Sequence, residues 1–276
     1  MGEKRLQCVQ CTSATITKAG FNQHGCQIDR CAACGRRQTE RSASAFRGYR
    51  FPDEIIALAV RWYLRFRLSY SDVAELLAER GIVVDASTIF DWVQHFTPLS
   101  QEAARPYRHR VGDCWSVDET SIRMAGQWVY AYRALDEHGQ VIDVSLSERR
   151  DRAAATAFLT TAIDSTGVRP QTVTTDKAPT SPPAVEAGIP EAEHITGKLE
   201  QQAIERDHQH RTGRVRGMRG VHELRCAQVI CVGHGFLRTL HMGFSRLAVP
   251  TGVACVGHPP RLTRAWDELT VYLRAA

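Results

Sequence analysis

The chain has 276 residues, of which 43% are hydrophobic and 24% are charged, as in an ordinary globular protein of one large or two to three small domains. No apolar run approaches the roughly 18 residues that a membrane span requires, which excludes a membrane-spanning helix. The net charge is +5, and the basic residues concentrate within 1–50 and 206–225, a pattern that favours a polyanionic partner. The first residues contain no apolar signal core, so a cytoplasmic protein, nucleoid-associated when bound to DNA, is expected.

Residues 1–45 contain two Cys-x-x-Cys motifs separated by 19 residues. Each such turn directs two sulfur atoms at one centre, and two turns complete the tetrahedral shell of a structural zinc ion. The four predicted ligands are Cys8, Cys11, Cys31 and Cys34. Cys26 or His24 could replace one of them. A segment this small cannot bury enough apolar surface to fold unaided, so one Zn²⁺ is expected to order it.

Residues 46–100 predict the three helices of a helix-turn-helix domain. Apolar residues recur at helical spacing after Pro52, a second helix ends at Gly81, and a third begins at Asp85 and is expected to stop at Pro98. In this motif the last helix lies in the major groove and presents polar side chains to DNA. The predicted DNA-contacting residues on it are Ser87, Thr88, Asp91 and Gln94. A plain three-helix bundle without DNA binding is the alternative.

Residues 112–245 change to a mixture of strand and helix patterns. Strands are predicted at 114–117, 128–135, 141–146 and 172–175, and helices at 153–163, 200–211 and 222–240. Three strands in a meander, followed by helix, strand and helix, predict a mixed α/β domain with a right-handed crossover.

Three carboxylates in this domain are the candidate catalytic residues. Asp118 follows a strand-like apolar run, Asp176 follows the strand at 172–175, and Glu205 lies in a predicted helix. Converging carboxylates repel one another unless cations neutralise them, and Mg²⁺ prefers hard oxygen ligands of this kind. Two Mg²⁺ ions could stabilise the attacking and leaving oxygens in phosphodiester chemistry. Taken singly, an Asp at a strand end is more often a turn or cap residue. The candidate phosphate contacts are Lys177, His208, Arg214 and Arg216.

Several motifs together resemble those of the DDE transposases of bacterial and archaeal insertion sequences, in the family founded by insertion sequence six. The motifs are Phe46–Gly48, Ser87–Val93, Trp115–Thr120, Thr175–Pro179 and Ile204–His208. The resemblance implies a ribonuclease-H-like fold in which Asp118, Asp176 and Glu205 form the metal-binding triad. It also implies a magnesium-dependent enzyme that binds terminal inverted repeats and joins 3′ ends to target DNA. Because two DNA ends must be held at once, a homodimer or larger assembly is expected.

Two regions depart from the family pattern. The stretch between Asp176 and Glu205 is shorter than usual, and residues 246–276 form a divergent tail that matches nothing in the family. These departures leave two alternatives open. One is a transposase that binds DNA without cutting it. The other is a zinc-containing DNA-binding regulator, which would give the three carboxylates no reason to converge.

Overall fold

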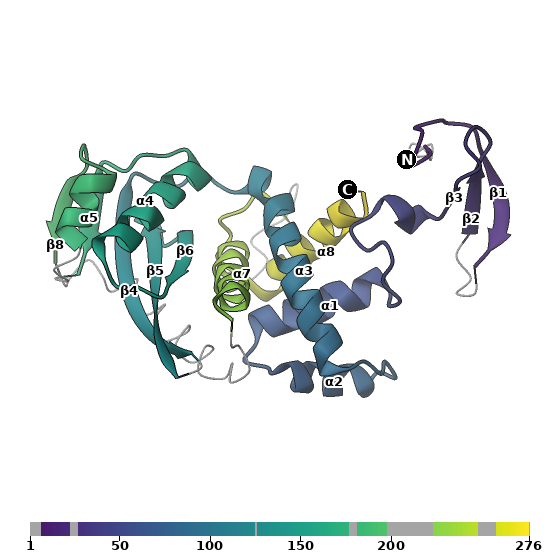
Figure 1. Ribbon diagram of the computed structural model, residues 1–276, viewed down its shortest axis with the longest axis horizontal. Helices are drawn as coiled ribbons and strands as arrows, with labels where there is room; N and C mark the ends of the chain where they lie inside the picture. The colour runs from purple at the N-terminus through teal and green to yellow at the C-terminus, as the bar shows by residue number, and fades with distance from the viewer. Residues whose placement is uncertain are drawn as a thin grey trace.

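The computed structural model describes residues 7–22, 27–124, 126–176, 181–197, 223–247 and 258–275. Along the long axis of the molecule lie an N-terminal β-ribbon, a group of packed helices and an α/β domain (Figure 1). None of the helices in these ranges combines the length and apolar character needed to cross a lipid bilayer.

The N-terminal ribbon contains strands that the sequence patterns did not predict. Its antiparallel sheet runs in the order β1 (Ile16–Phe21), β2 (Gln27–Cys31) and β3 (Arg37–Gln38), followed by the short 3₁₀ helix η1 (Glu40–Ala43). The buried side chains of the described ribbon are two cysteines, one aspartate and one glutamine. With no large apolar side chain buried there, the cysteine cluster occupies the place of a hydrophobic core.

Three helices follow, as the sequence predicts: α1 (Asp53–Arg65), α2 (Tyr70–Ala78) and α3 (Ala86–Ala104). A capping box begins α2, in which the Asp72 amide donates to Ser69 Oγ and the Ser69 amide donates to the Asp72 carboxylate. The expectation that α3 stops at Pro98 is wrong, because the helix continues for six residues beyond it to Ala104. Pro98 is exposed, and buried residues on both sides of it, including Phe96 and Ser100, hold the helix against the core.

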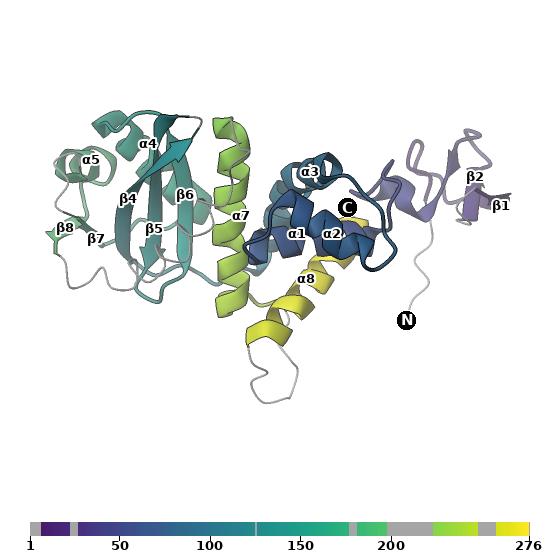
Figure 2. The ribbon, with the colours of Figure 1, turned by 90° about the horizontal axis from the view of Figure 1, so that it is seen from below.

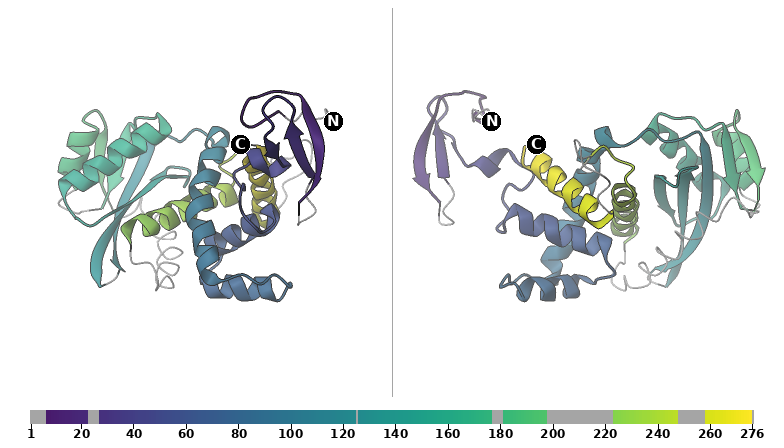
Figure 3. Two further views of the ribbon diagram at one scale, coloured as in Figure 1. Left: turned by 45° about the vertical axis from the view of Figure 1, so that its right-hand side comes forward. Right: turned by 180° about the vertical axis from the view of Figure 1, so that it is seen from behind.

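Two helices from the C-terminal part of the chain complete this helical core. They are α7 (Leu224–Met242) and α8 (His258–Ala275). Helix α8 packs against α1, α3 and α7 (Figure 3), and its Trp266 is 3% exposed and donates from Nε1 to the Ala57 carbonyl at 2.9 Å. The divergent residues 246–276 therefore include a helix that packs into the core.

The α/β domain is built on a five-stranded mixed sheet in the order β6-β5-β4-β7-β8. The strands are β4 (Cys114–Met124), β5 (Gln127–Asp136), β6 (Val141–Ser147), β7 (Thr172–Thr175) and β8 (Glu193–Thr196). β4 pairs with β7 in parallel and with β5 in antiparallel fashion. The expected mixed sheet, with an antiparallel meander and a parallel strand beside it, is confirmed. Strand β8 was not predicted, and β4 extends well past its predicted end.

Helices cover both faces of this sheet. Helices α4 (Arg152–Thr166) and α5 (Ser181–Gly188) pack on one face, where Phe158 contacts Tyr132 of β5. Helix α7 lies on the opposite face, with Cys231 buried against Leu135 and Val144. Figure 2 shows α7 between the sheet and the other helices, so one helix belongs to both cores.

Candidate active site

Two of the three predicted carboxylates come together at the centre of the sheet. The parallel register of β4 and β7 ends at the pair Val117–Thr175, and Asp118 and Asp176 are the next residue on each side. Both aspartates line the same small pocket of about 20 Å³. Asp118 is held by the middle of a long central strand and Asp176 by the end of a buried short one. The backbone thus delivers two acidic side chains to one position.

The residue after Asp118 has a different environment. Side chains alternate along a strand, so the Glu119 side chain points to the α4 face, on which the pocket lies, whereas Asp118, which borders the same pocket from β4, directs its side chain toward the α7 face. The Glu119 side chain is 7% exposed and forms an ion pair with Arg150, whose Nε lies 2.6 Å from Glu119 Oε1. Burial raises the pKa of the Glu119 carboxyl, Arg150 opposes that rise, and the nearby charge of Asp176 adds to it. Burial also raises the pKa of Tyr132, which lines the same pocket, to about 12.

A buried arginine lies across from Asp118. Arg133 of β5 is the antiparallel register partner of Asp118 and is 3% exposed. Directly opposite residues share a face of the sheet, with Cβ atoms about 4.5–5.5 Å apart. A guanidinium in this position offsets part of the repulsion among the carboxylates.

The end of β7 is fixed from its other side by β8. His194 Nε2 lies 2.8 Å from Thr175 Oγ1, in a hydrogen bond whose donor depends on the histidine tautomer. Burial lowers the pKa of His194, which favours its neutral form. This bond positions the residue immediately before Asp176.

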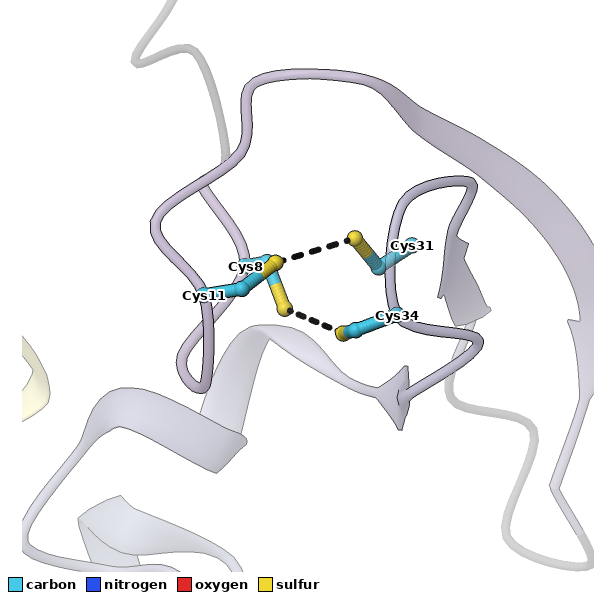
Figure 4. A group of neighbouring side chains, drawn as sticks. All are labelled: Cys8, Cys11, Cys31 and Cys34. Carbon is cyan, nitrogen blue, oxygen red and sulfur yellow. Dashed lines mark hydrogen bonds between the residues drawn. The ribbon is translucent and has the colours of Figure 1, made fainter.

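The four predicted zinc ligands also come together (Figure 4). The sulfur atoms of Cys8, Cys11, Cys31 and Cys34 all lie within 4.8 Å of one another. Two of the cross-motif pairs, Cys8–Cys34 and Cys11–Cys31, are 3.5 Å apart. Tetrahedral coordination with Zn–S bonds near 2.3 Å places sulfurs about 3.8 Å apart, so the donor set and its size fit zinc.

The backbone of each cysteine turn favours a thiolate on its first sulfur. The Cys11 amide lowers the pKa of Cys8, to about 6, and the Cys34 amide lowers the pKa of Cys31. Metal-bound cysteine is deprotonated, so this geometry is suited to a cation. Cys26 and His24, the possible replacements, lie outside the described residues.

Comparison with known proteins gives the family. A family model described as a DDE domain matches residues 112–243. The transposase of the insertion sequence-like element IS431mec of Staphylococcus aureus (strain Mu50) is 38% identical over 171 residues, which cover 60% of this chain and 75% of that protein. The transposase of IS257 in transposon Tn4003 of the same species is 37% identical over the same length. The chain belongs to the insertion-sequence-six family of DDE transposases.

Two solved structures are also similar to this transposase. The magnesium complex of the HTLV-2 integrase catalytic core domain, in its trimeric form, aligns with a TM-score of 0.36 and 17% identity, covering 49% of this chain and 88% of that one. The simian T-cell lymphotropic virus intasome with PP2A regulatory subunit B56 gamma aligns with a TM-score of 0.38 and 14% identity, covering 70% of each chain. The family assignment rests on the sequence relatives and not on these structures.

The predicted DNA-contacting residues of this transposase lie on two different faces of α3. Ser87 and Asp91 are exposed, one helical turn apart, and Thr88 beside them is partly buried. Gln94 points toward α7, where its amide nitrogen lies 3.4 Å from the Cys226 carbonyl oxygen. The exposed stripe of α3 continues instead through His95, which packs against Tyr49.

The remaining predicted site residues of the transposase lie outside the described residues. They are Glu205, Lys177, His208, Arg214 and Arg216. Sequence reasoning also missed two residues that line the pocket, Glu119 and Tyr132, and it missed Arg150, which pairs with Glu119. The strict alternation along 115–119 was the available signal for Glu119. No local signal identified Arg150, because it reaches Glu119 from the loop before α4.

Proposed function

We propose that this transposase binds the terminal inverted repeats of an insertion sequence, cleaves DNA strands in a magnesium-dependent reaction and joins the freed 3′ ends to target DNA. One observation carries the proposal. Asp118 and Asp176, supplied by two adjacent parallel strands within the region that matches the DDE domain, line a single pocket. Such convergence of like charges is unfavourable unless cations bind there.

The residues at the pocket fit a magnesium centre because they offer hard oxygen ligands. Asp118 and Asp176, together with Glu205, would hold two Mg²⁺ ions. Bound magnesium supplies charge stabilisation for the attacking and the leaving oxygens of a phosphodiester. The chain itself fixes the two aspartates through the β4–β7 register, and Arg133 balances their charge from the neighbouring strand.

DNA recognition is assigned to the N-terminal part of the chain. The zinc ribbon and the exposed stripe of α3, with Ser87, Thr88 and Asp91, would contact the terminal repeats. Lys177, His208, Arg214 and Arg216 would contact phosphates near the carboxylates, so binding should weaken steeply with salt. Two ends of the element have to be held together for joining, which requires a dimer or a larger assembly.

The test uses the DNA that flanks the coding region as substrate, in Mg²⁺ and in EDTA. Asp118→Asn and Asp176→Asn each remove a charged ligand without changing side-chain shape. Both variants should lose strand cleavage, by about 10²-fold or more, yet bind the DNA as the parent protein does. Asp164→Asn is the matched control, because Asp164 is an exposed carboxylate of α4 in the same domain.

The control should cleave at the parent rate. Full cleavage by the Asp118 variant would refute the assignment. Specific DNA binding by a parent protein that never cleaves in Mg²⁺ would favour a transposase that binds without cutting, or a regulator.

A further inference from the structure

The β4–β5 hairpin carries a strip of aromatic and basic side chains on its α4 face. Alternation puts Tyr132, Tyr130 and Trp128 of β5 on this face, and their register partners on β4 share it. Those partners are Glu119, Ser121 and Arg123, respectively. Figure 1 shows both strands continuing beyond the part of the sheet that α4 covers. The strip therefore leaves the domain core and runs along the open end of the hairpin.

Exposure increases along the strip. Tyr132 is 3% exposed and stacks on Phe158 of α4, Tyr130 is partly buried, and Trp128 is 57% exposed. The guanidinium of Arg123 lies over the Trp128 ring, 5.9 Å from its centroid. A large indole left in water on a strand, beside an arginine that is itself exposed, is a combination suited to binding and not to core packing.

The strip begins at the candidate active site. Tyr132 and Glu119 line the same pocket as Asp118 and Asp176, and Arg150 pairs with Glu119 at that end. Trp128 is four residues from Tyr132 along β5, a distance of about 13 Å in an extended strand. A stacked DNA strand advances about 3.4 Å per nucleotide, so about three to four nucleotides span the strip from Trp128 to Tyr132.

We propose that Tyr130, Trp128 and Arg123 bind unpaired nucleotides of the DNA substrate along the α4 face of the hairpin. This inference rests on the proposed function. Aromatic rings beside cationic side chains stack on bases of any sequence. Bases inside a duplex have both faces covered by their neighbours, so the indole selects nucleotides that are already unpaired. Arg123, whose guanidinium lies beside the Trp128 ring, supplies positive charge for a neighbouring phosphate.

The first test needs neither the terminal-repeat sequence nor catalysis. The full chain is titrated in EDTA against a labelled oligothymidylate of about twelve nucleotides and against an abasic oligonucleotide of the same length, with fluorescence anisotropy as the readout. Trp128→Ala should weaken oligothymidylate binding by about 10-fold. It should leave abasic binding within about 2-fold of the parent, because stacking needs a base. Trp128→Phe keeps a ring and should retain most of the affinity.

The matched control is Phe66→Ala. Phe66 is 51% exposed and has the Arg65 guanidinium 5.7 Å from its ring centroid, the same kind of pair at the end of α1. The ratio of oligothymidylate to abasic affinity should be unchanged in this variant and reduced in Trp128→Ala. Circular dichroism melts of all the variants establish that each is folded, as expected for substitutions at exposed side chains.

Three results would overturn the inference. One is a Trp128→Ala protein that binds oligothymidylate like the parent, and another is an equal loss on both oligonucleotides. The third is a change in oligomeric state on light scattering with unchanged oligothymidylate binding, which would make the strip a contact between two copies of the chain. The parent protein could also fail to cleave DNA while Trp128→Ala still loses base-dependent binding. That result would support nucleotide binding by the strip and refute the proposed function.

Discussion

Two carboxylates that are adjacent in the sequence have different roles in this transposase. Asp118 lies on the α7 face beside Arg133, whereas Glu119 lies on the α4 face and pairs with Arg150. The one-residue step along β4 decides which acid shares a face with Arg133 and which one pairs with Arg150. Arg150 supplies a counter-charge to the buried Glu119 carboxyl group at 2.6 Å, which opposes the rise in its pKa that burial causes. A change at Arg150 would leave that carboxylate buried without its cation.

His194 gives a prediction about pH. Its folded-state pKa lies below the ordinary value of 6.5 because of burial, so the unfolded chain binds more protons between the two values. Its contribution to stability is therefore full above pH 6.5 and is lost as the pH falls through the folded pKa. We expect the melting temperature of the metal-free protein to fall more between about pH 7.5 and about pH 5.5 than that of His194→Gln. Equal falls in the two proteins would contradict the prediction.

At the scale of elements, the N-terminal ribbon depends on the cysteine cluster. The described ribbon buries Cys8 and Cys31 but no large apolar side chain, so its strands have little else to hold them together. Bound zinc would contribute about 10–16 kcal/mol to ordering such a segment. Removing it with a chelator should unfold residues 7–38 and leave the helices and the α/β domain folded.

Amide hydrogen exchange, followed peptide by peptide, measures this prediction. Protection of the ribbon should disappear on chelation and return with added Zn²⁺, with Cys11→Ser as a variant that does not recover. Purified protein that holds no zinc, or a ribbon that stays protected in chelator, would refute the assignment.

Helix α8 should contribute strongly to the stability of the helical core. Trp266→Ala removes a side chain that is 3% exposed and its hydrogen bond to the Ala57 carbonyl. A Trp→Ala change in a core costs about 3–5 kcal/mol of unfolding free energy. Val271→Ala on the same helix is the control, because Val271 is 57% exposed and should change stability by less than about 0.5 kcal/mol. Urea unfolding of both variants provides the comparison, and similar midpoints would mean that α8 is not part of the core.

At the scale of the whole molecule, α7 joins the two larger parts of the chain. Its Ile230 and Leu237 are buried among the helices, and its Cys231 is buried against β5 and β6. Gly233 permits the close approach, since a Cβ there would lie 2.6 Å from Thr97 Cγ2 and 2.9 Å from Leu64 Cδ2. The helical core and the α/β domain share one helix, so we expect them to unfold together.

Gly233→Ala tests that coupling. The added methyl group overpacks the contact, which costs about 1–3 kcal/mol, and the better helix propensity of alanine returns about 1 kcal/mol. The net effect should be a lower melting temperature in a single calorimetric transition. Gly188→Ala is the control, because its Cβ would meet Leu159 at an ordinary 3.5 Å. Two separate transitions, with only one of them shifted, would show that the domains unfold independently.

The sequence by itself determined the family, the three helices of the N-terminal helical part, the mixed α/β character of the second domain and its candidate aspartates. All of these features depend on short-range patterns that can be read directly from the amino-acid sequence. Helical spacing of apolar residues, strand-like runs ending at Asp118 and Asp176, and paired cysteine turns each reflect a short-range physical rule. The predicted end of α3 at Pro98 was wrong, because tertiary packing of the residues on both sides of Pro98 outweighs the cost of a proline inside the helix.

Only the tertiary structure decided which residues from distant parts of the sequence lie next to one another. The register of β4 with β7 and β5 brings Asp176 and Arg133 to Asp118, and no local pattern contains that register. The same holds for Arg150 at Glu119, for Gln94 turned toward α7, and for α8 inside a core that begins two hundred residues earlier in the chain. Contacts of long sequence separation form because the assembled core favours them, so they become visible only once the chain is folded.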